Sequence, residues 1–329
     1  MYGKIIRLCN RRISLMILFS FTLLFSSFGM LTHNAIANIT TTTIRTGMDT
    51  LPIGVAVNPN TNKIYVTTNQ GNGVLIIDGN TSAISGAIKV GSRPYAITVN
   101  PNTNTIYVTN RSSHNVSVVN GSTNTVTATI NIDGDLVGIA VNPTTNKIYV
   151  NGGNGIYVIN GSTNKITSTI PASILASLNV VVNSITNKIY VSDGKQTVYV
   201  INGSTDNIAS EITVANAPAG MAIDVNTNTI FVATKNNNSL VMINGSTNSI
   251  TNTMKVGTNP VGIVVNHAAN KIYVTNGGDN TLSVISGATN SITSNITVGN
   301  LPTGIGFNPT TNKIYVSNII DNSISVLGG

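Results

Sequence analysis

The chain has 329 residues, of which only 8% are charged, and its formal net charge at pH 7 is +7. Globular proteins usually contain about 25% charged residues, so Asn, Thr, Ser and Gly must supply much of the polar surface. Four of the 17 basic residues lie in the first twelve positions, and without them the balance is 13 basic against 10 acidic residues, or +3. This small charge, with no Lys/Arg cluster, argues against a nucleic-acid partner.

Residues 1–37 have the pattern of a signal peptide. An apolar stretch at residues 13–32 follows the basic residues and precedes Ala35-Ile36-Ala37, an A-x-A cleavage pattern. We predict cleavage before Asn38, although the stretch is also long enough to remain as an N-terminal membrane anchor. Both alternatives place the rest of the chain in the cell envelope or the extracellular space, because the basic flank stays in the cytoplasm. The single cysteine, Cys9, lies within this segment, so residues 38–329 can form no disulfide.

A tripeptide of Ile, an aromatic residue and Val recurs through the rest of the chain. Its copies begin at Ile64, Ile106, Ile148, Ile189, Ile230, Ile272 and Ile314, at steps of 42, 42, 41, 41, 42 and 42 residues. The nine residues NPTTNKIYV occur unchanged at 142–150 and at 308–316, in the third and seventh copies. A regular interval of this length is the signature of a repeat protein whose units share a core. We therefore predict one domain, residues 38–329, built from seven units.

Each unit is expected to form four short strands. In the third unit the runs GIAV (138–141), KIYV (147–150) and GIYVI (155–159) are rich in β-branched and aromatic residues, which favour strands. A fourth run, KITSTI (165–170), alternates apolar residues with Thr and Ser, as a half-exposed edge strand does. The connections contain Asn-Pro and Asn-Gly turn signals, and strands joined by such short turns must be antiparallel.

A single sheet of this size cannot bury both of its faces, so each unit needs neighbours on both sides. Closure of the units into a ring predicts an all-β, seven-bladed β-propeller with GIAV innermost and KITSTI outermost. An open stack is the alternative, but it would leave two sheet faces exposed. The last unit ends at Gly329 after its third strand, and residues 38–47, NITTTTIRTG, resemble the fourth strands of other units. We expect this N-terminal segment to complete the last blade and close the ring.

The repeats NPTTNKIYV, TIYVTN (105–110) and VINGSTNKI (158–166) resemble the YVTN family of β-propeller repeats, which occurs in archaeal surface-layer proteins and other exported envelope proteins. The resemblance covers residues 38–329 and implies a propeller at the cell surface. It implies no catalytic residue, because the shared positions are turn and core residues. Units four and five depart most: residues 171–182 lack the Gly-x-x-Pro-x-Gly approach to the inner strand, and Asp224-Val225 replaces Asn-Pro.

Few residues are available for chemistry. After residue 37 there are one glutamate, nine aspartates and two histidines, His114 and His267, and these have no zinc-binding spacing. Asp133-Gly134-Asp135 has carboxylates spaced as in a calcium loop, but it lacks the full pattern and is expected to form a turn. A nucleophilic hydroxyl needs a base, and only His114 lies in a loop with any freedom. We predict no catalytic residue, no metal and no cofactor.

The loops between second and third strands, and those that enter each first strand, are expected on one face of the ring, called here the loop face. Sequence variety is concentrated in these loops, and variable loops on a fixed scaffold commonly carry binding sites. Relaxed selection would produce the same variety. The candidate partner-binding residues are Arg93, Tyr95, Arg111, His114, Asp135, Asp193, Lys195, Lys235, Asp279 and Asp321.

Two further sets of residues recur in the sequence. Lys63, Lys147, Lys188, Lys271 and Lys313 are expected on the opposite face, as a solvated rim or, alternatively, as contacts for an anionic glycan. Sequons for N-glycans occur at Asn38, Asn80, Asn110, Asn115, Asn120, Asn160, Asn202, Asn237, Asn244 and Asn295. Four of these sequons are the same NGS turn, which hairpin chemistry explains without a glycan.

These observations predict a non-catalytic, exported, monomeric propeller that binds a cell-surface protein or glycan through its loop face. The alternative is an extracytoplasmic lactonase-, lyase- or dehydrogenase-like enzyme with its site at the mouth of the central channel. Acids, histidines and arginines that converge on one point of this mouth would favour the enzyme.

Overall fold

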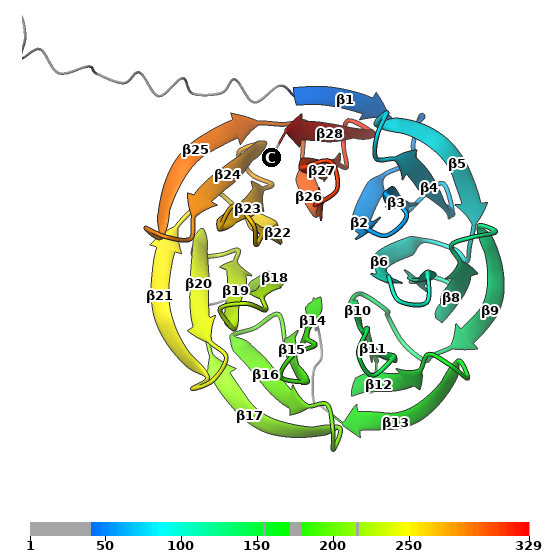
Figure 1. The fold of residues 1–329 in the computed structure, drawn as a ribbon, viewed down its shortest axis with the longest axis horizontal. Coiled ribbons are helices and arrows are strands. Elements are labelled where there is room, and N and C mark those ends of the chain that lie inside the picture. The colour runs from blue at the N-terminus through cyan, green and yellow to red at the C-terminus, as the bar shows by residue number, and fades with distance from the viewer. Residues whose placement is uncertain (1–40, 154, 172–178, 215–216, 329) are drawn as a thin grey trace, which may run out of the picture. The chain divides into compact units, whose positions relative to one another are not determined.

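The computed structural model describes residues 41–153, 155–171, 179–214 and 217–328. Within them, 28 strands form seven four-stranded antiparallel sheets that surround a central axis like the blades of a propeller (Figure 1). The predicted all-β, seven-bladed propeller is therefore confirmed. No helix long and apolar enough to cross a membrane occurs in this part of the chain. The predicted signal peptide or anchor at residues 1–37 lies outside the described residues.

In blades 1 to 6 the strands follow chain order from the innermost to the outermost, and in blade 7 the outermost strand is β1. Blades 1 and 2 contain β2 (Pro52–Asn58), β3 (Lys63–Thr68), β4 (Gly73–Asp78) and β5 (Ala83–Lys89), then β6 (Pro94–Asn100), β7 (Thr105–Asn110), β8 (Asn115–Asn120) and β9 (Thr125–Asn131). Blades 3 and 4 contain β10 (Ile139–Asn142), β11 (Lys147–Gly152), β12 (Gly155–Asn160) and β13 (Lys165–Pro171), then β14 (Asn179–Asn183), β15 (Lys188–Ser192), β16 (Thr197–Asn202) and β17 (Asn207–Thr213). Blades 5 and 6 contain β18 (Pro218–Asp224), β19 (Thr229–Thr234), β20 (Ser239–Asn244) and β21 (Ser249–Lys255), then β22 (Pro260–Asn266), β23 (Lys271–Asn276), β24 (Thr281–Ser286) and β25 (Ser291–Thr297). Blade 7 contains β26 (Pro302–Asn308), β27 (Lys313–Asn318), β28 (Ser323–Gly328) and β1 (Thr41–Arg45).

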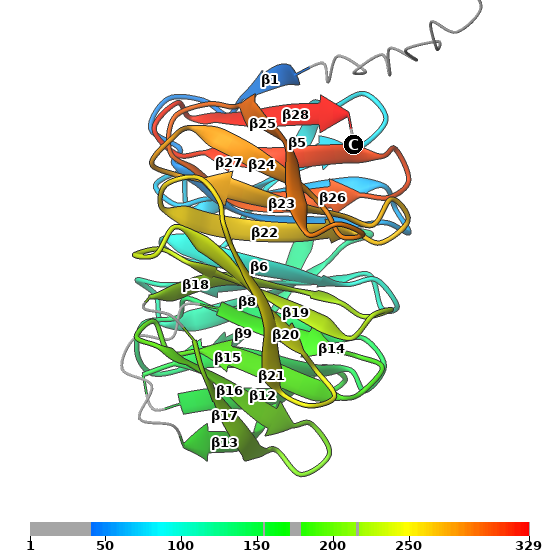
Figure 2. The same ribbon diagram turned by 90° about the vertical axis from the view of Figure 1, so that its left-hand side faces the viewer.

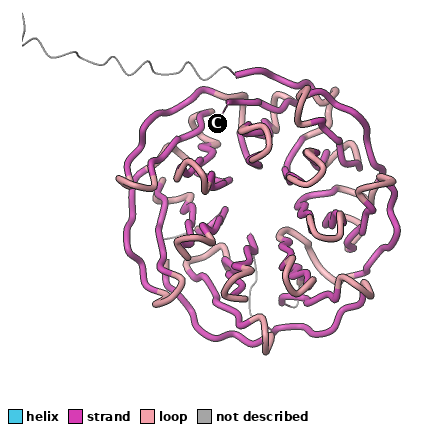
Figure 3. Tube along the Cα trace, viewed as in Figure 1, coloured by secondary structure: helices cyan, strands magenta, loops and turns pink. Residues whose placement is uncertain are grey.

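The blades are twisted from the axis outwards. In side view the outer strand β25 crosses the wall of the ring steeply relative to the inner strand β22 of the same blade (Figure 2). This rotation between neighbouring strands is the normal right-handed twist of a sheet. Short loops and turns join the strands at both ends of each blade (Figure 3), so the two faces of the ring are made of loops and the wall is made of strands.

The second strand of each blade is buried from both sides. Ile148, Tyr149 and Val150 of β11 are all 0% exposed. Tyr149 packs in a core cluster with residues of blade 4, whereas Ile148 and Val150 pack in another cluster with residues of blade 2. Successive strand residues point to opposite faces of a sheet, so one tripeptide serves two blade interfaces. The core is consequently shared around the ring, and no blade has a core of its own.

The first strands approach one another closely around the channel. A β-carbon on Gly220 of β18 would lie 1.7 Å from the carbonyl oxygen of Val261 in β22, and one on Gly304 of β26 would lie 1.9 Å from that of Ile53 in β2. No side chain fits at such distances, so the spacing of the inner strands requires glycine here. The glycine in the predicted innermost run, GIAV in the third unit, therefore matches the crowding at the axis.

The N-terminal strand β1 completes blade 7. It pairs antiparallel with β28, from Thr41 opposite Leu327 to Arg45 opposite Ser323, and it lies outside β28 in Figure 1. Ile44 packs against the core cluster between blades 7 and 1. The backbone N–H of Thr46 donates to the carbonyl oxygen of Asn322 at 2.9 Å, immediately after the strand. The predicted closure of the ring is confirmed, and the open stack is excluded.

A ring of asparagine side chains joins neighbouring blades on the face opposite the loop face, called here the turn face. The asparagine that ends a first strand donates from Nδ2 to Oδ1 of a turn asparagine in the next blade, as Asn142 does to Asn187 at 2.8 Å. The other links of this kind are Asn58–Asn104, Asn100–Asn146, Asn183–Asn228, Asn266–Asn312 and Asn308–Asn62. The acceptors have a positive φ, 52° for Asn187, which asparagine tolerates well. The two asparagines of NPTTN therefore contact different neighbouring blades.

One link of this asparagine ring is ionisable. Asp224 replaces the donor asparagine of blade 5, and its Oδ1 lies 3.0 Å from Nδ1 of His267 in blade 6. The Asp224 side chain is only 8% exposed, whereas that of His267 is 40% exposed. Burial alone would raise the pKa of Asp224, but hydrogen bonds from His267 and from the backbone N–H of Asn226 outweigh burial and lower this pKa below 3.8. The departure from Asn-Pro noted in the sequence thus gives one blade interface a charge.

We expect this link to make the fold sensitive to acid. Because the pKa of Asp224 is lower in the folded chain than in the unfolded chain, its ionised form stabilises the fold above about pH 4, and this contribution disappears as the pH falls through the folded pKa. Asp224→Asn restores the amide of the other blades, so its melting temperature should fall less between pH 7 and pH 3 than that of the native chain. Thermal melts across this range measure the difference. Parallel pH profiles would show that the Asp224–His267 pair contributes nothing.

The recurring lysines join blades instead of forming the solvated rim that the sequence predicts. All five are half-buried, and four of them donate from Nζ to a turn carbonyl of the next blade, as Lys188 does to Gly245 at 2.7 Å and Lys147 to Gly203 at 3.0 Å. Lys147 also forms an ion pair with Asp206 at 2.9 Å. The prediction was wrong because sequence spacing places these lysines on the turn face but does not show the neighbouring turn that covers them. They offer little free charge to a glycan.

Candidate functional site

The loop face is organised as the sequence predicts. In blades 1 to 3 and 5 to 7, the loop between the second and the third strand is hydrogen-bonded to the loop that enters the first strand of the same blade. In blade 2 the backbone N–H of Arg111 donates to the carbonyl oxygen of Arg93 at 2.9 Å, and in blade 5 that of Lys235 donates to Ala217 at 3.0 Å. The variable loops of these blades are therefore joined in pairs on the loop face.

Four of the ten candidate residues come together between blades 2 and 3. We call Tyr95, Arg111, His114 and Asp135 the rim cluster. Arg111 donates from Nη2 to Oδ2 of Asp135 at 2.8 Å, and its guanidinium lies 5.7 Å from the centre of the Tyr95 ring. Nδ1 of His114 lies 2.8 Å from the carbonyl oxygen of Gly134. The rim cluster is thus a preformed group of an aromatic ring, a cation, an acid and an imidazole.

The rim cluster remains accessible to a partner. The side chains of Arg111 and Asp135 are 44% and 64% exposed. The hydrogen bond from Arg111 is the main reason that the pKa of the Asp135 carboxyl is lowered, and the same bond raises the pKa of Arg111. Both groups are therefore ionised at neutral pH. An exposed pair of this kind adds little to stability, whereas arginine and tyrosine are enriched at the centres of binding interfaces.

Three candidate aspartates accept hydrogen bonds from loop backbone: Asp193 within its own loop, and Asp279 and Asp321 from the loop that enters the first strand of their blade. Oδ1 of Asp193 accepts hydrogen bonds from three backbone N–H groups, including that of Lys195 at 2.8 Å, and Asp193 is buried. Oδ2 of Asp321 accepts from the backbone N–H of Asn300 at 2.7 Å, and Asp279 accepts from that of Thr258. These carboxylates therefore have structural partners. Lys195 is exposed on the loop face, as is Arg93, which adopts a φ of 52°.

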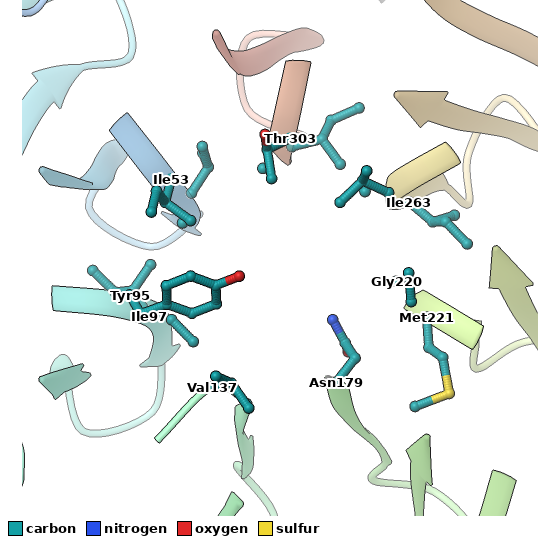
Figure 4. Close-up of a pocket in the computed structure, with 18 of the residues that line it drawn as sticks. Ile53, Tyr95, Ile97, Val137, Asn179, Gly220, Met221, Ile263 and Thr303 are labelled. Carbon is teal, nitrogen blue, oxygen red and sulfur yellow. The ribbon is translucent and has the colours of Figure 1, made fainter. Parts of the chain in front are cut away.

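The central channel was not identified in the sequence as a set of residues. It has a volume of about 350 Å³ and is lined by the first strands of all the blades. Figure 4 shows Ile53, Val137, Ile263 and Met221 around it, with the hydroxyl of Tyr95 pointing into the space. Its wall is mostly aliphatic side chains and backbone. The available sequence signal was the residue before the inner-strand glycine or alanine, because this position is tyrosine in blade 2 and threonine in blade 7 and aliphatic in blades 1, 3, 5 and 6.

Lys235 is a second polar group of the channel lining, contributed by the loop between β19 and β20. Lys235 is half-buried, and loss of hydrating water lowers the pKa of its ammonium. Tyr95 and Lys235 are the only residues among the described channel lining whose side chains can exchange a proton. The channel lining therefore combines aliphatic side chains with the ammonium of Lys235, the hydroxyls of Tyr95 and Thr303, and the amide of Asn179.

The Asp133-Gly134-Asp135 segment forms the turn that the sequence predicts. Gly134 has a φ of 93°, and the carbonyl oxygen of Asp133 accepts from the backbone N–H of Gly153 at 3.0 Å. Asp135 is occupied by Arg111, as described above. Among the described residues, no group of three or more His, Cys, Asp or Glu side chains lies close enough to hold a metal ion.

The sequons differ in their accessibility. Asn110 is 0% exposed, and its Nδ2 donates to Asn115 and Ser117 at 2.8 Å, so the folded chain cannot carry a glycan there. Asn38 lies outside the described residues. The exposed sequon asparagines are Asn80, Asn120, Asn160, Asn202, Asn237 and Asn295.

No protein-family model matches the chain, and no curated protein sequence matches it. The chain is similar in structure to a chain of hydrazine synthase from Kuenenia stuttgartiensis, with a TM-score of 0.78 and 15% sequence identity over 86% of this chain and 97% of that chain. At this identity the likeness shows the fold alone. The protein is therefore a seven-bladed β-propeller by its structure, and its membership of the YVTN repeat family stays a prediction from the repeat residues.

Proposed function

We propose that this protein is a non-catalytic, exported propeller of the YVTN repeat type. In this role it would resemble surface-layer propellers and bind a protein or glycan partner at the cell surface. The rim cluster carries this proposal. It presents an aromatic ring and a fixed, ionised cation on the variable loop face, where exposed arginine and tyrosine supply much of the energy of binding interfaces. The N-terminal segment with its A-x-A pattern supports export.

The enzyme alternative has less support. It requires acids, histidines and arginines that converge on one point at the mouth of the channel. The described channel lining provides only Tyr95 and Lys235 as groups that exchange protons. In the rim cluster, Asp135 and Arg111 are paired with each other, and the imidazole of His114 contacts the carbonyl oxygen of Gly134. No described nucleophile therefore has a free base beside it, which an acyl- or glycosyl-transfer site would need.

Binding to intact cells tests the proposal. Labelled Arg111→Glu protein should bind the surface of the producing cells at least about tenfold more weakly than the native chain, because it loses a central cation and repels Asp135. Lys165→Glu is the matched control, since it makes the same change of charge at an exposed position of the outer strand β13. Treating the cells with protease or with glycosidase separates a protein partner from a glycan. Equal binding of the two variants would contradict a role for the rim cluster.

A further inference from the structure

Lys235 and Arg111 occupy equivalent positions in their blades but have different surroundings. Each lies five residues after the isoleucine of its repeat, at the start of the loop between the second and third strands. The guanidinium of Arg111 forms an ion pair with the carboxylate of Asp135. In the next blade after Lys235, the position equivalent to Asp135 is Asn259, which carries no charge. One of the two equivalent cations therefore has a carboxylate partner, and the other does not.

Among the described residues, the ammonium of Lys235 forms no ion pair. No described side chain or carbonyl oxygen accepts a hydrogen bond from its Nζ, although its backbone N–H is bonded to Ala217. Burial lowers its pKa because the charged form loses water. A half-buried charge without a partner is unfavourable, and an anion beside it would remove this cost. Apolar residues such as Ile53, Val137 and Val261 belong to the same channel lining.

We propose that the central channel is a binding site for a small monocarboxylate with an apolar body. The carboxylate pairs with the ammonium of Lys235, and the hydroxyl of Tyr95 supplies a second donor within the same cavity. The apolar body packs against the aliphatic side chains of the inner strands. A cavity that combines apolar side chains with a small number of polar groups is typical of small-molecule sites.

The dimensions and charge of the cavity limit the ligand. Its volume of about 350 Å³ corresponds to about ten water molecules, so a ligand on the order of ten non-hydrogen atoms fits. A single ammonium matches one negative charge, whereas a doubly charged phosphate would leave part of its charge unpaired in an apolar wall. A neutral amide of the same shape would gain the apolar contacts but not the ion pair.

Calorimetry with two probes on the full chain tests the site. Octanoate has the size and charge that the cavity admits, and octanamide has the same number of non-hydrogen atoms without the charge. The native chain should bind octanoate at least about tenfold more tightly than octanamide, because the charge-assisted hydrogen bond forms only with the acid. Lys235→Gln should weaken octanoate binding by roughly 10- to 100-fold and leave octanamide binding within about twofold.

Two controls make the result specific to the channel. Lys195→Gln removes the same charge from an exposed position of the neighbouring loop and should leave octanoate binding unchanged. Lys235→Met tests the same loss with an apolar side chain, and the melting temperature of each variant shows that it is folded. Four outcomes would overturn the proposal: no binding of octanoate, equal binding of the two probes, unchanged octanoate binding in Lys235→Gln, or an equal loss in Lys195→Gln. Octanoate binding is measured on the isolated chain, whereas the partner surface is tested on intact cells, so either proposal can fail while the other holds.

Discussion

Deletion of residues 38–47 should lower the melting temperature of the propeller by roughly 10–20 °C, on the basis of about 2–4 °C for each kcal/mol in a protein of this size. The deletion removes β1, which exposes the edge of β28 and uncovers the core cluster that Ile44 helps to close. It also removes the bonds from Thr46 to Asn322. Blade 7 would be left with three strands at the point where the ring closes.

Point substitutions in β1 separate this effect from a general effect of shortening the chain. Ile44→Asp places a charge against the core between blades 7 and 1 and should cost roughly 2–4 kcal/mol. Thr43→Asp introduces the same charge at the exposed neighbouring position and should cost under about 0.5 kcal/mol. Thermal or urea unfolding measures both. If the deletion or Ile44→Asp melts like the native chain, β1 does not hold the ring closed.

Asn142→Ala should destabilise the protein by roughly 2–4 kcal/mol, because it breaks one link of the asparagine ring and leaves buried polar groups without partners. Asn142 is 0% exposed and donates to Asn187 at 2.8 Å. Its Oδ1 also accepts from the backbone N–H groups of Thr144 at 3.0 Å and Thr145 at 3.3 Å. The substitution removes all of these bonds at the interface of blades 3 and 4.

Asn160→Ala is a matched control in the same blade. Oδ1 of Asn160 likewise accepts from the backbone N–H groups two and three residues later, at 2.9 Å from Ser162 and 3.2 Å from Thr163. Asn160 is exposed, however, so water can replace its bonds. We expect a loss of roughly 0.5–1 kcal/mol for this variant, measured by urea unfolding. Equal losses in the two variants would show that the asparagine ring adds nothing beyond the local turn.

The strands and their order could be predicted from the sequence because each was read from a short local pattern. Ile148-Tyr149-Val150 repeats at a fixed interval, and the threonine-rich segment at the N-terminus resembles the outer strands, which was sufficient to predict where it pairs. The asparagine ring could not be predicted in this way. The sequence predicts Asn142 as a turn residue, which accounts for its bonds to Thr144 and Thr145. Its third partner, Asn187, belongs to the next blade and becomes a neighbour only when the two blades pack together.

The candidate site was predicted less completely than the fold. The sequence placed Arg111, His114, Tyr95 and Asp135 on one face, and the structure brings them together. It could not show that Asp193 binds the backbone of its own loop, because a loop carboxylate that faces solvent has the same sequence pattern as one that caps N–H groups. The burial of recurring lysines such as Lys188, and the approach of Lys235 to the channel, likewise depend on neighbouring blades.

The pairing of β1 with β28 also imposes an order on biosynthesis. Of the 28 described strands, the ribosome makes Thr41–Arg45 first and Ser323–Gly328 last, so β1 must wait unpaired until the other strands have been translated. Such a distant pairing is slow to form, and a free strand is a site for aggregation during this time. The composition of β1 reduces this risk, since Ile44 is its only apolar residue and three threonines precede it. The polar character of this strand is thus suited to a nascent polypeptide whose ring cannot close until β28 has been made.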